Sequence, residues 1–162
     1  MKKFALAFAT VLLTTFSSMN VMATPGERSD KNIVEIAVGA GSFNTLVAAV
    51  KAADLVGALS GPGPLTVFAP TDAAFAKLPA GTVEFLLANI DQLTSILTYH
   101  VVAGEKNPKE LLSEQFVKTL EGSDVEAKGC ARMLMINNSL VIAKPIYASN
   151  GVIYVIDAVL LP

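Results

Sequence analysis

His100 and Cys130 limit the chemistry that this chain can do, because each is the only residue of its type among 162. A nucleophilic triad or a metal site would have to use His100, and the one thiol lies far from it in the sequence. No serine stands in a Gly-x-Ser-x-Gly turn, and the sequence has no glycine-rich phosphate loop. The sequence therefore predicts a protein that is not an enzyme and that uses no metal and no cofactor.

Two polar residues stand in apolar surroundings. His100 follows Leu97 on one helical face, so we expect a ring at the edge of the core whose nitrogens are bonded to the backbone or to a hydroxyl. Asp157 interrupts an apolar run, and an unpaired buried carboxylate is costly. We expect Asp157 either at a surface edge or bonded to backbone amides.

The stretch from Leu65 to Phe75 is the element around which the chain is organised. It begins as a strand of β-branched and aromatic residues, and Pro70 ends that strand because proline cannot donate to the ladder. Thr71 or Asp72 then offers a side-chain oxygen to the free amides of a short helix. Phe75 is expected to anchor this helix in the core.

The rest of the chain is helical first and then rich in strands. Side-chain caps are expected at Asn32, Ser42, Asp91 and Asn107, each before apolar residues at helical spacing. A change to β-forming residues is expected at 99–102, and strands are predicted at 116–120, 125–128, 133–136, 140–143 and 152–161, with spacings that suit antiparallel hairpins. This order predicts the α+β class.

Three segments carry a resemblance to a known family: residues 65–75 (LTVFAPTDAAF), 96–102 (ILTYHVV) and 150–157 (NGVIYVID). In this order they closely resemble the signature segments of fasciclin domains. The resemblance covers about residues 32–162. It implies a wedge-shaped antiparallel β-sandwich with helices packed against it, present here as a single module.

The resemblance also implies roles for individual residues. In fasciclin domains a Tyr-His pair, here Tyr99 and His100, is associated with adhesion and with holding the fold together. Tyr154 stands where many bacterial relatives have histidine, which removes any role that needs that imidazole. Integrin-directed relatives use an Asp-Ile-type pair of residues in this last segment. Ile156-Asp157 resembles that pair only loosely, so the resemblance does not imply integrin binding for this chain.

The N-terminus has the features of an export signal. Lys2 and Lys3 precede an apolar run, and small residues end at Ala23, so residues 1–23 are expected to be a signal peptide cleaved after Ala23. Residues 24–31 are expected to be a flexible leader, and residues 32–162 the domain. The product is expected to be secreted or periplasmic, without stable membrane insertion.

Charge and cysteine content restrict the partners. Removal of the signal peptide, with Lys2 and Lys3, leaves 10 basic and 14 acidic residues and a net charge of −4. This charge predicts no nucleic-acid binding. Cys130 is either a buried small side chain or an exposed thiol that could join two molecules. We therefore expect a monomer, with a dimer through Cys130 as the alternative.

Two functions follow from the sequence. The first is an adhesion module that binds a surface or matrix protein, or a polysaccharide, through a face formed by Phe75, Tyr99, His100, Tyr154 and Asp157. Thr71, Asp72 and His100 would hold the motif together. The alternative is a carrier of an apolar small molecule, held in a cleft beside the helix of the first signature segment.

Overall fold

The computed structural model describes residues 28–130 and 133–162, apart from the side chain of Cys130. The predicted signal peptide, its cleavage after Ala23 and most of the predicted leader lie outside these residues. The burial of the Cys130 thiol, and with it a dimer through that thiol, also lies outside them.

Helices come first along the chain and most of the strands come last, which confirms the predicted α+β class. The helices are α1 (Ile33–Ala40), α2 (Asn44–Ala52), α3 (Val56–Ser60), α4 (Asp72–Ala76), α5 (Thr82–Ala88), α6 (Ile90–Tyr99) and α7 (Pro108–Glu114). The strands are β1 (Leu65–Pro70), β2 (Val101–Ala103), β3 (Phe116–Lys118), β4 (Asp124–Cys130), β5 (Met133–Ile136), β6 (Ser139–Leu140), β7 (Ile146–Ala148) and β8 (Gly151–Ile156).

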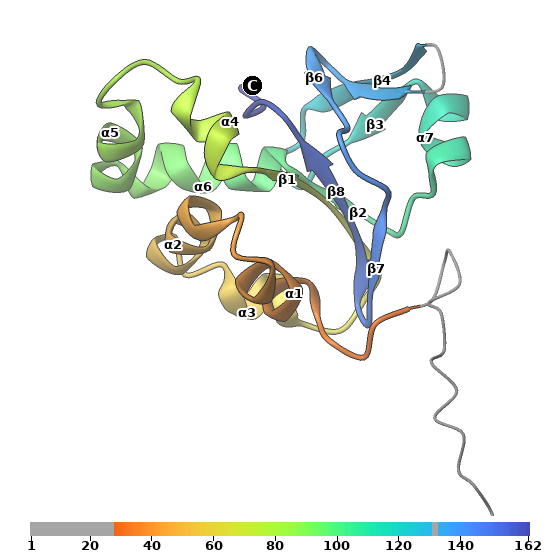
Figure 1. Ribbon diagram of the computed structural model, residues 1–162, viewed down its shortest axis with the longest axis horizontal. Coiled ribbons are helices and arrows are strands. Elements are labelled where there is room, and N and C mark those ends of the chain that lie inside the picture. Colours follow the sequence, from red (N-terminus) through yellow and green to blue (C-terminus); the bar gives the residue numbers. More distant parts are fainter. Residues whose placement is uncertain (1–27, 131–132) are drawn as a thin grey trace, which may run out of the picture.

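The strands form two four-stranded sheets, ordered β2-β1-β8-β7 and β3-β4-β5-β6 (Figure 1). Bridges between Val102 and Thr119 and between Val141 and Ile156 join the sheets at two places. Neighbouring strands are antiparallel except for β1 and β8, which pair in parallel along their whole length. The sequence predicted only hairpins and missed this pair, because its strands lie about eighty residues apart and no local turn signal connects them.

β8 separates two apolar cores, and its alternating side chains supply both. Tyr154 and Ile156 point into the sheet core, which lies between the two sheets. Ile153 and Val155 point into the helical core, where helices α1 to α6 cover the other face of the first sheet. Every residue of β8 is buried, as expected for a central strand that has a core on each side.

Gly151 allows β1 and β8 to pair at their first residues. A Cβ atom at this position would lie 2.0 Å from the carbonyl oxygen of Leu65, far inside any permitted contact. Only glycine lets the two backbones approach this closely, so the Asn-Gly of the third signature segment is explained by backbone packing.

Several local predictions are confirmed and others are wrong. Asn32 and Asn107 form complete capping boxes at α1 and α7. Ser42 and Asp91 do not cap, because α2 and α6 begin after Phe43 and Asn89, neither of which makes a side-chain cap.

The strand boundaries also differ from the prediction. Tyr99 is the last residue of α6 and not the first of a strand, and the predicted strand at 152–161 ends at Ile156. The sequence analysis missed β7, which follows Pro145 and has only three residues. A strand that short carries too little alternation to be recognised.

The described end of the predicted leader follows the free edge of β7. Ser29 donates its backbone N–H to the carbonyl of Tyr147 at 2.8 Å, and Ser149 donates to the carbonyl of Lys31 at 2.9 Å. Arg28 forms an ion pair with Glu105 at 2.9 Å. Residues 28–31 therefore cover a sheet edge in the described structure, and the flexibility of the leader stays a prediction.

Candidate functional site

The Thr71-Asp72 corner joins two helices. Thr71 accepts a hydrogen bond from the N–H of Ala74 at 3.2 Å and caps α4, as predicted. Asp72 instead accepts from the N–H groups of Asn44 and Thr45, at 3.3 and 2.8 Å, and so caps α2. The hydrogen bond from Thr45 is the main cause of the lowered pKa of Asp72. The corner therefore holds α4 against α2, with Phe75 buried in the helical core below it.

His100 connects the end of α6 to the C-terminal segment. Its ring is 2% exposed. Nε2 accepts the N–H of Leu160 at 2.9 Å, so Nδ1 carries the proton and donates to the carbonyl of Ile96 at 2.7 Å. Burial lowers the pKa of His100 from 6.5 to about 4, against the opposing effect of the Ile96 hydrogen bond. The imidazole is therefore a neutral structural link at physiological pH.

Tyr99 reaches into the second sheet. Its hydroxyl donates to the carbonyl of Asp124 at 3.3 Å and accepts from the amide nitrogen of Asn137 at 3.0 Å. Asn137 also accepts the N–H of Glu126 at 2.7 Å. The Tyr99-His100 pair thus joins α6 to the second sheet on one side and to the C-terminal segment on the other.

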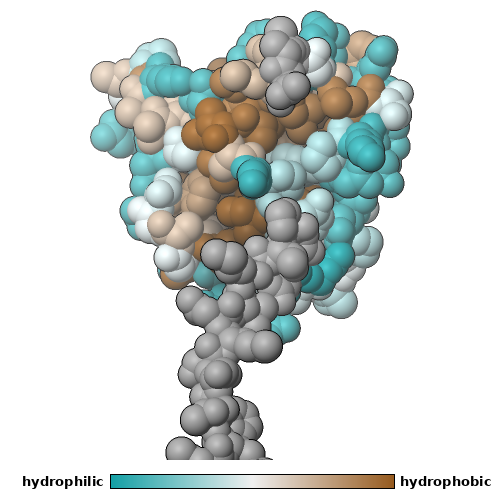
Figure 2. Space-filling model, turned by 45° about the vertical axis from the view of Figure 1, so that its right-hand side comes forward, coloured by the Kyte–Doolittle hydropathy of each residue, from teal (hydrophilic) through white to brown (hydrophobic). Residues whose placement is uncertain are grey.

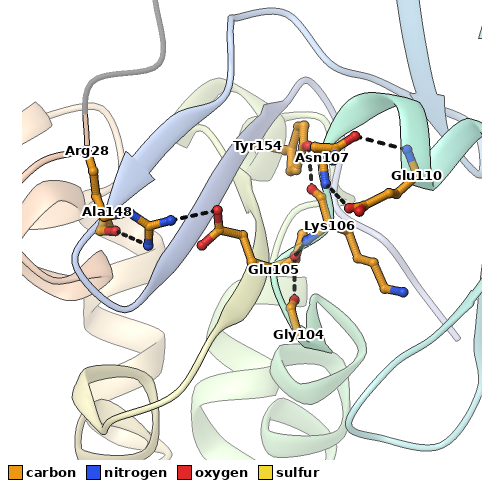
Figure 3. A network of polar contacts seen from close by, with 9 residues as sticks. Arg28, Gly104, Glu105, Lys106, Asn107, Glu110, Ala148 and Tyr154 are labelled. Carbon is orange, nitrogen blue, oxygen red and sulfur yellow. Dashed lines mark hydrogen bonds and ion pairs between the residues drawn. The ribbon is translucent and has the colours of Figure 1, made fainter.

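Tyr154 holds the connection between β2 and α7. Its ring is fully buried beside Phe68, with the ring centroids 5.8 Å apart. Its hydroxyl donates to the carbonyl of Lys106 at 2.6 Å, just before the capping box of Asn107 and Glu110 (Figure 3). Burial is the main cause of the raised pKa of Tyr154. This hydroxyl is a hydrogen-bond donor at every physiological pH.

Asp157 turns the chain at the end of β8. One carboxylate oxygen accepts the N–H of Leu140 at 2.8 Å, and the other lies 3.2 Å from Nζ of Lys77. The Leu140 hydrogen bond is the main cause of the lowered pKa of Asp157. The prediction that this carboxylate is bonded to a backbone amide is confirmed.

Most of the predicted binding residues do not form an exposed face. Phe75, Tyr99, His100 and Tyr154 are at most 9% exposed, so a partner cannot touch them in the described structure. We therefore correct the prediction that these four residues form an exposed binding face. Their side chains hold the conformation of the domain. Asp157 alone among the five is partly exposed. Any effect of the five on binding stays a prediction.

A small apolar cavity lies beside β1 of the first signature segment, and none of its lining residues comes from α4, beside which the ligand cleft was predicted. The space between α1, α2, α3 and the first sheet is apolar and measures about 30 Å³, with Leu46, Val50 and Ile153 among its walls. That volume is about the share of one water molecule in the liquid. The structure therefore does not support a small-molecule carrier at this place.

A larger concavity, which was not predicted from the sequence, is lined mainly by residues outside the signature segments, with the buried Tyr154 as the exception. We call it the outer groove; it measures about 340 Å³, and its walls include Pro108, Met133, Ile142, Lys144, Pro145 and Tyr154. Figure 2 shows apolar surface gathered on this face of the molecule with hydrophilic surface around it. The signal in the sequence was the run of apolar residues at 133–136, which we interpreted only as a strand next to Cys130.

Metal sites and membrane spans were also sought in the described part of the chain. No three residues of the types His, Cys, Asp and Glu gather there closely enough to hold a metal ion. Within residues 28–130 and 133–162, every helix is too short or too polar to cross a membrane.

Comparisons with known proteins agree on one family. The model of the fasciclin domain matches residues 41–162. An uncharacterized protein of Synechocystis, sll1735, is 54% identical over 130 residues, which cover 80% of this chain and 97% of that protein. The cell surface glycolipoprotein MPB83 of Mycobacterium bovis is 43% identical over 109 residues, which cover 67% of this chain and 48% of the glycolipoprotein.

A solved structure shares the fold. The FAS1 domain pair of the insect cell adhesion molecule fasciclin I superposes with a TM-score of 0.51 at 16% identity, covering 78% of this chain and 43% of the pair. At that identity the likeness establishes the fold alone. It confirms the fasciclin-type architecture that the resemblance implied.

Proposed function

Because the chain belongs to the fasciclin domain family, we propose that it is an exported interaction module that adheres to a protein or polysaccharide at a cell surface or in the surrounding matrix. It acts by binding and not by catalysis, and it uses no metal or cofactor. A similar mycobacterial protein is named a cell surface glycolipoprotein, and a protein of the same fold is a cell adhesion molecule. Both names support a surface role.

The observation that carries the proposal is the contrast between the outer groove, which exposes apolar side chains, and the signature segments, which bury their polar groups. Met133 and Ile142 are 54% and 51% exposed beside the outer groove, while the polar groups of the signature segments are turned inward. Apolar side chains that gather on one face of a monomer mark a place where another molecule binds. The adhesive surface in this proposal is therefore the face around the outer groove.

Adhesion of coated beads to the surface of the native host tests this proposal. Protein recovered from the periplasm or medium should begin at Thr24. Beads coated with that protein should adhere to host cells above the level of beads coated with heat-unfolded protein. Equal adhesion of the two kinds of bead would refute the function, and a protein that keeps Met1 and stays in the cytoplasm would refute the export.

A further inference from the structure

We propose that the outer groove is a docking site for an extended protein segment that combines apolar side chains with a carboxylate. This inference rests on the proposed function and names the kind of partner. Three features of the groove lead to it: rigid walls, an exposed apolar rim and one cationic side chain without an internal partner.

The walls of the groove are held before any partner arrives. Pro108 is the first residue of α7, where the capping box of Asn107 and Glu110 fixes it. Pro145 stands directly before β7. Proline has few conformations to lose, so little ordering is needed when a partner binds.

The rim of the groove is apolar and adaptable. Met133 and Ile142 expose more than half of their surface to water, and both line the groove. A partner that covers them removes apolar surface from water, which favours association. Methionine can adjust its three torsions to different apolar side chains, which suits it to peptide recognition.

Charge distinguishes the partner. Among the described residues that line the groove, Lys144 is the one that carries a charge, and within the same part of the chain it forms no ion pair. Four carboxylates on or near α7 and β4 are already bonded within the described residues: Glu105 to Arg28, Glu110 to the N–H of Asn107, Glu114 to Lys106 and Glu126 to Lys128. Lys144 is thus left for a carboxylate that the partner supplies.

The shape of the groove favours a protein segment over a small molecule or a membrane. The groove is a partly open concavity, whereas a small ligand is usually bound with 70–90% or more of its surface buried. A partner protein supplies the missing cover from outside. A bilayer offers a broad surface to protruding side chains, and this site is concave with proline walls.

Selection of 12-residue peptides displayed on phage against the exported full-length chain tests the inference. We expect selected peptides to share apolar residues with an Asp or Glu beside them. Substitution Ile142→Glu should weaken their binding about tenfold or more, and Lys144→Glu about fivefold. Replacing the acidic residue of a synthetic selected peptide by Lys should restore its binding to the Lys144→Glu protein.

Phe85→Glu is the matched control, because Phe85 on α5 is 55% exposed, outside the set of groove-lining residues. It should leave peptide binding unchanged, and all three variants should keep the thermal midpoint of the parent. A selection that yields no peptide, or peptides that bind the Ile142→Glu protein as well as the parent, would overturn the inference. So would sedimentation with phosphatidylglycerol vesicles that is lost in the Ile142→Glu protein, because the groove would then bind a membrane.

The same variants separate this inference from the proposed function. If the Ile142→Glu protein on beads adheres to host cells as well as the parent, the groove is not the adhesive surface, and adhesion stands but must be assigned to another face. If parent beads do not adhere although peptides bind in the groove, the adhesive function fails and the docking site stands.

Discussion

The signature segments and the outer groove place polar and apolar groups in opposite ways. The signature residues bury polar side chains and bond them, and every buried side-chain nitrogen and oxygen of the described residues has a partner. The groove exposes apolar side chains and Lys144, which has no ion pair within residues 28–130 and 133–162. A polar group that is fully bonded inside the protein has nothing left to offer a partner. The comparison predicts that changes in the signature segments alter stability, while changes in the groove alter binding.

Phe75→Ala should give the largest loss of stability, and an unchanged stability would contradict the comparison. The ring is 9% exposed in the helical core, and truncation of a buried aromatic residue leaves a cavity. We expect the free energy of unfolding to fall by about 3–5 kcal/mol, measured by urea denaturation. Below the denaturation midpoint, bead adhesion should equal that of the parent. Equal midpoints for variant and parent would show that the first signature segment is an exposed corner.

His100 should make stability depend on pH. The unfolded chain takes up a proton near pH 6.5, but the folded ring does so only near pH 4. Stabilisation is therefore complete above pH 6.5 and is lost as the pH falls toward 4, by about 3 kcal/mol. Glutamine offers a donor and an acceptor and does not titrate, so the His100→Gln protein should show a flatter profile over this range.

Two comparisons make the His100 prediction specific. Asp72 and Asp157 have pKa values below the ordinary 3.8, so their stabilisation is lost only at lower pH, and equally in parent and variant. Parent and Gln profiles that stay parallel between pH 6.5 and 4 would show that the ring is not buried neutral. A His100→Ala protein with an unchanged thermal midpoint that no longer adheres would place the imidazole in contact with a partner.

Local signals in the sequence predicted the elements and the anchors well. The proline after β1, the threonine cap of α4 and the capping boxes at Asn32 and Asn107 depend on neighbours within a few residues. The family resemblance supplied the architecture. Phe75 and His100 were expected in the core from helical spacing, and both are there.

Contacts between distant segments could not be read from the sequence. Asp72 caps α2 through Thr45, which lies 27 residues before it, and no local pattern distinguishes this from capping its own helix. The parallel pairing of β1 with β8 and the outer groove likewise join segments that are far apart in sequence. The binding face predicted from the sequence included residues whose side chains point inward, because resemblance identifies residue types without showing which way they point.

The ion pair between Lys77 and Asp157 should have the smallest effect, and it sharpens the comparison at Asp157, the partly exposed member of the five residues predicted to bind a partner. The two side chains are 58% and 34% exposed, so water and salt screen their attraction. Lys77→Ala should change the free energy of unfolding by less than about 1 kcal/mol, and 1 M NaCl should remove the difference from the parent.

Asp157→Ala should cost more, about 1 kcal/mol or above, because it also leaves the N–H of Leu140 without its carboxylate acceptor. Thermal midpoints of both variants at low and high salt, with Lys51→Ala as an exposed-lysine control, measure the two contributions separately. If either variant kept its stability but lost bead adhesion, Asp157 would belong to the binding surface, and the division between a structural signature and a binding groove would fail.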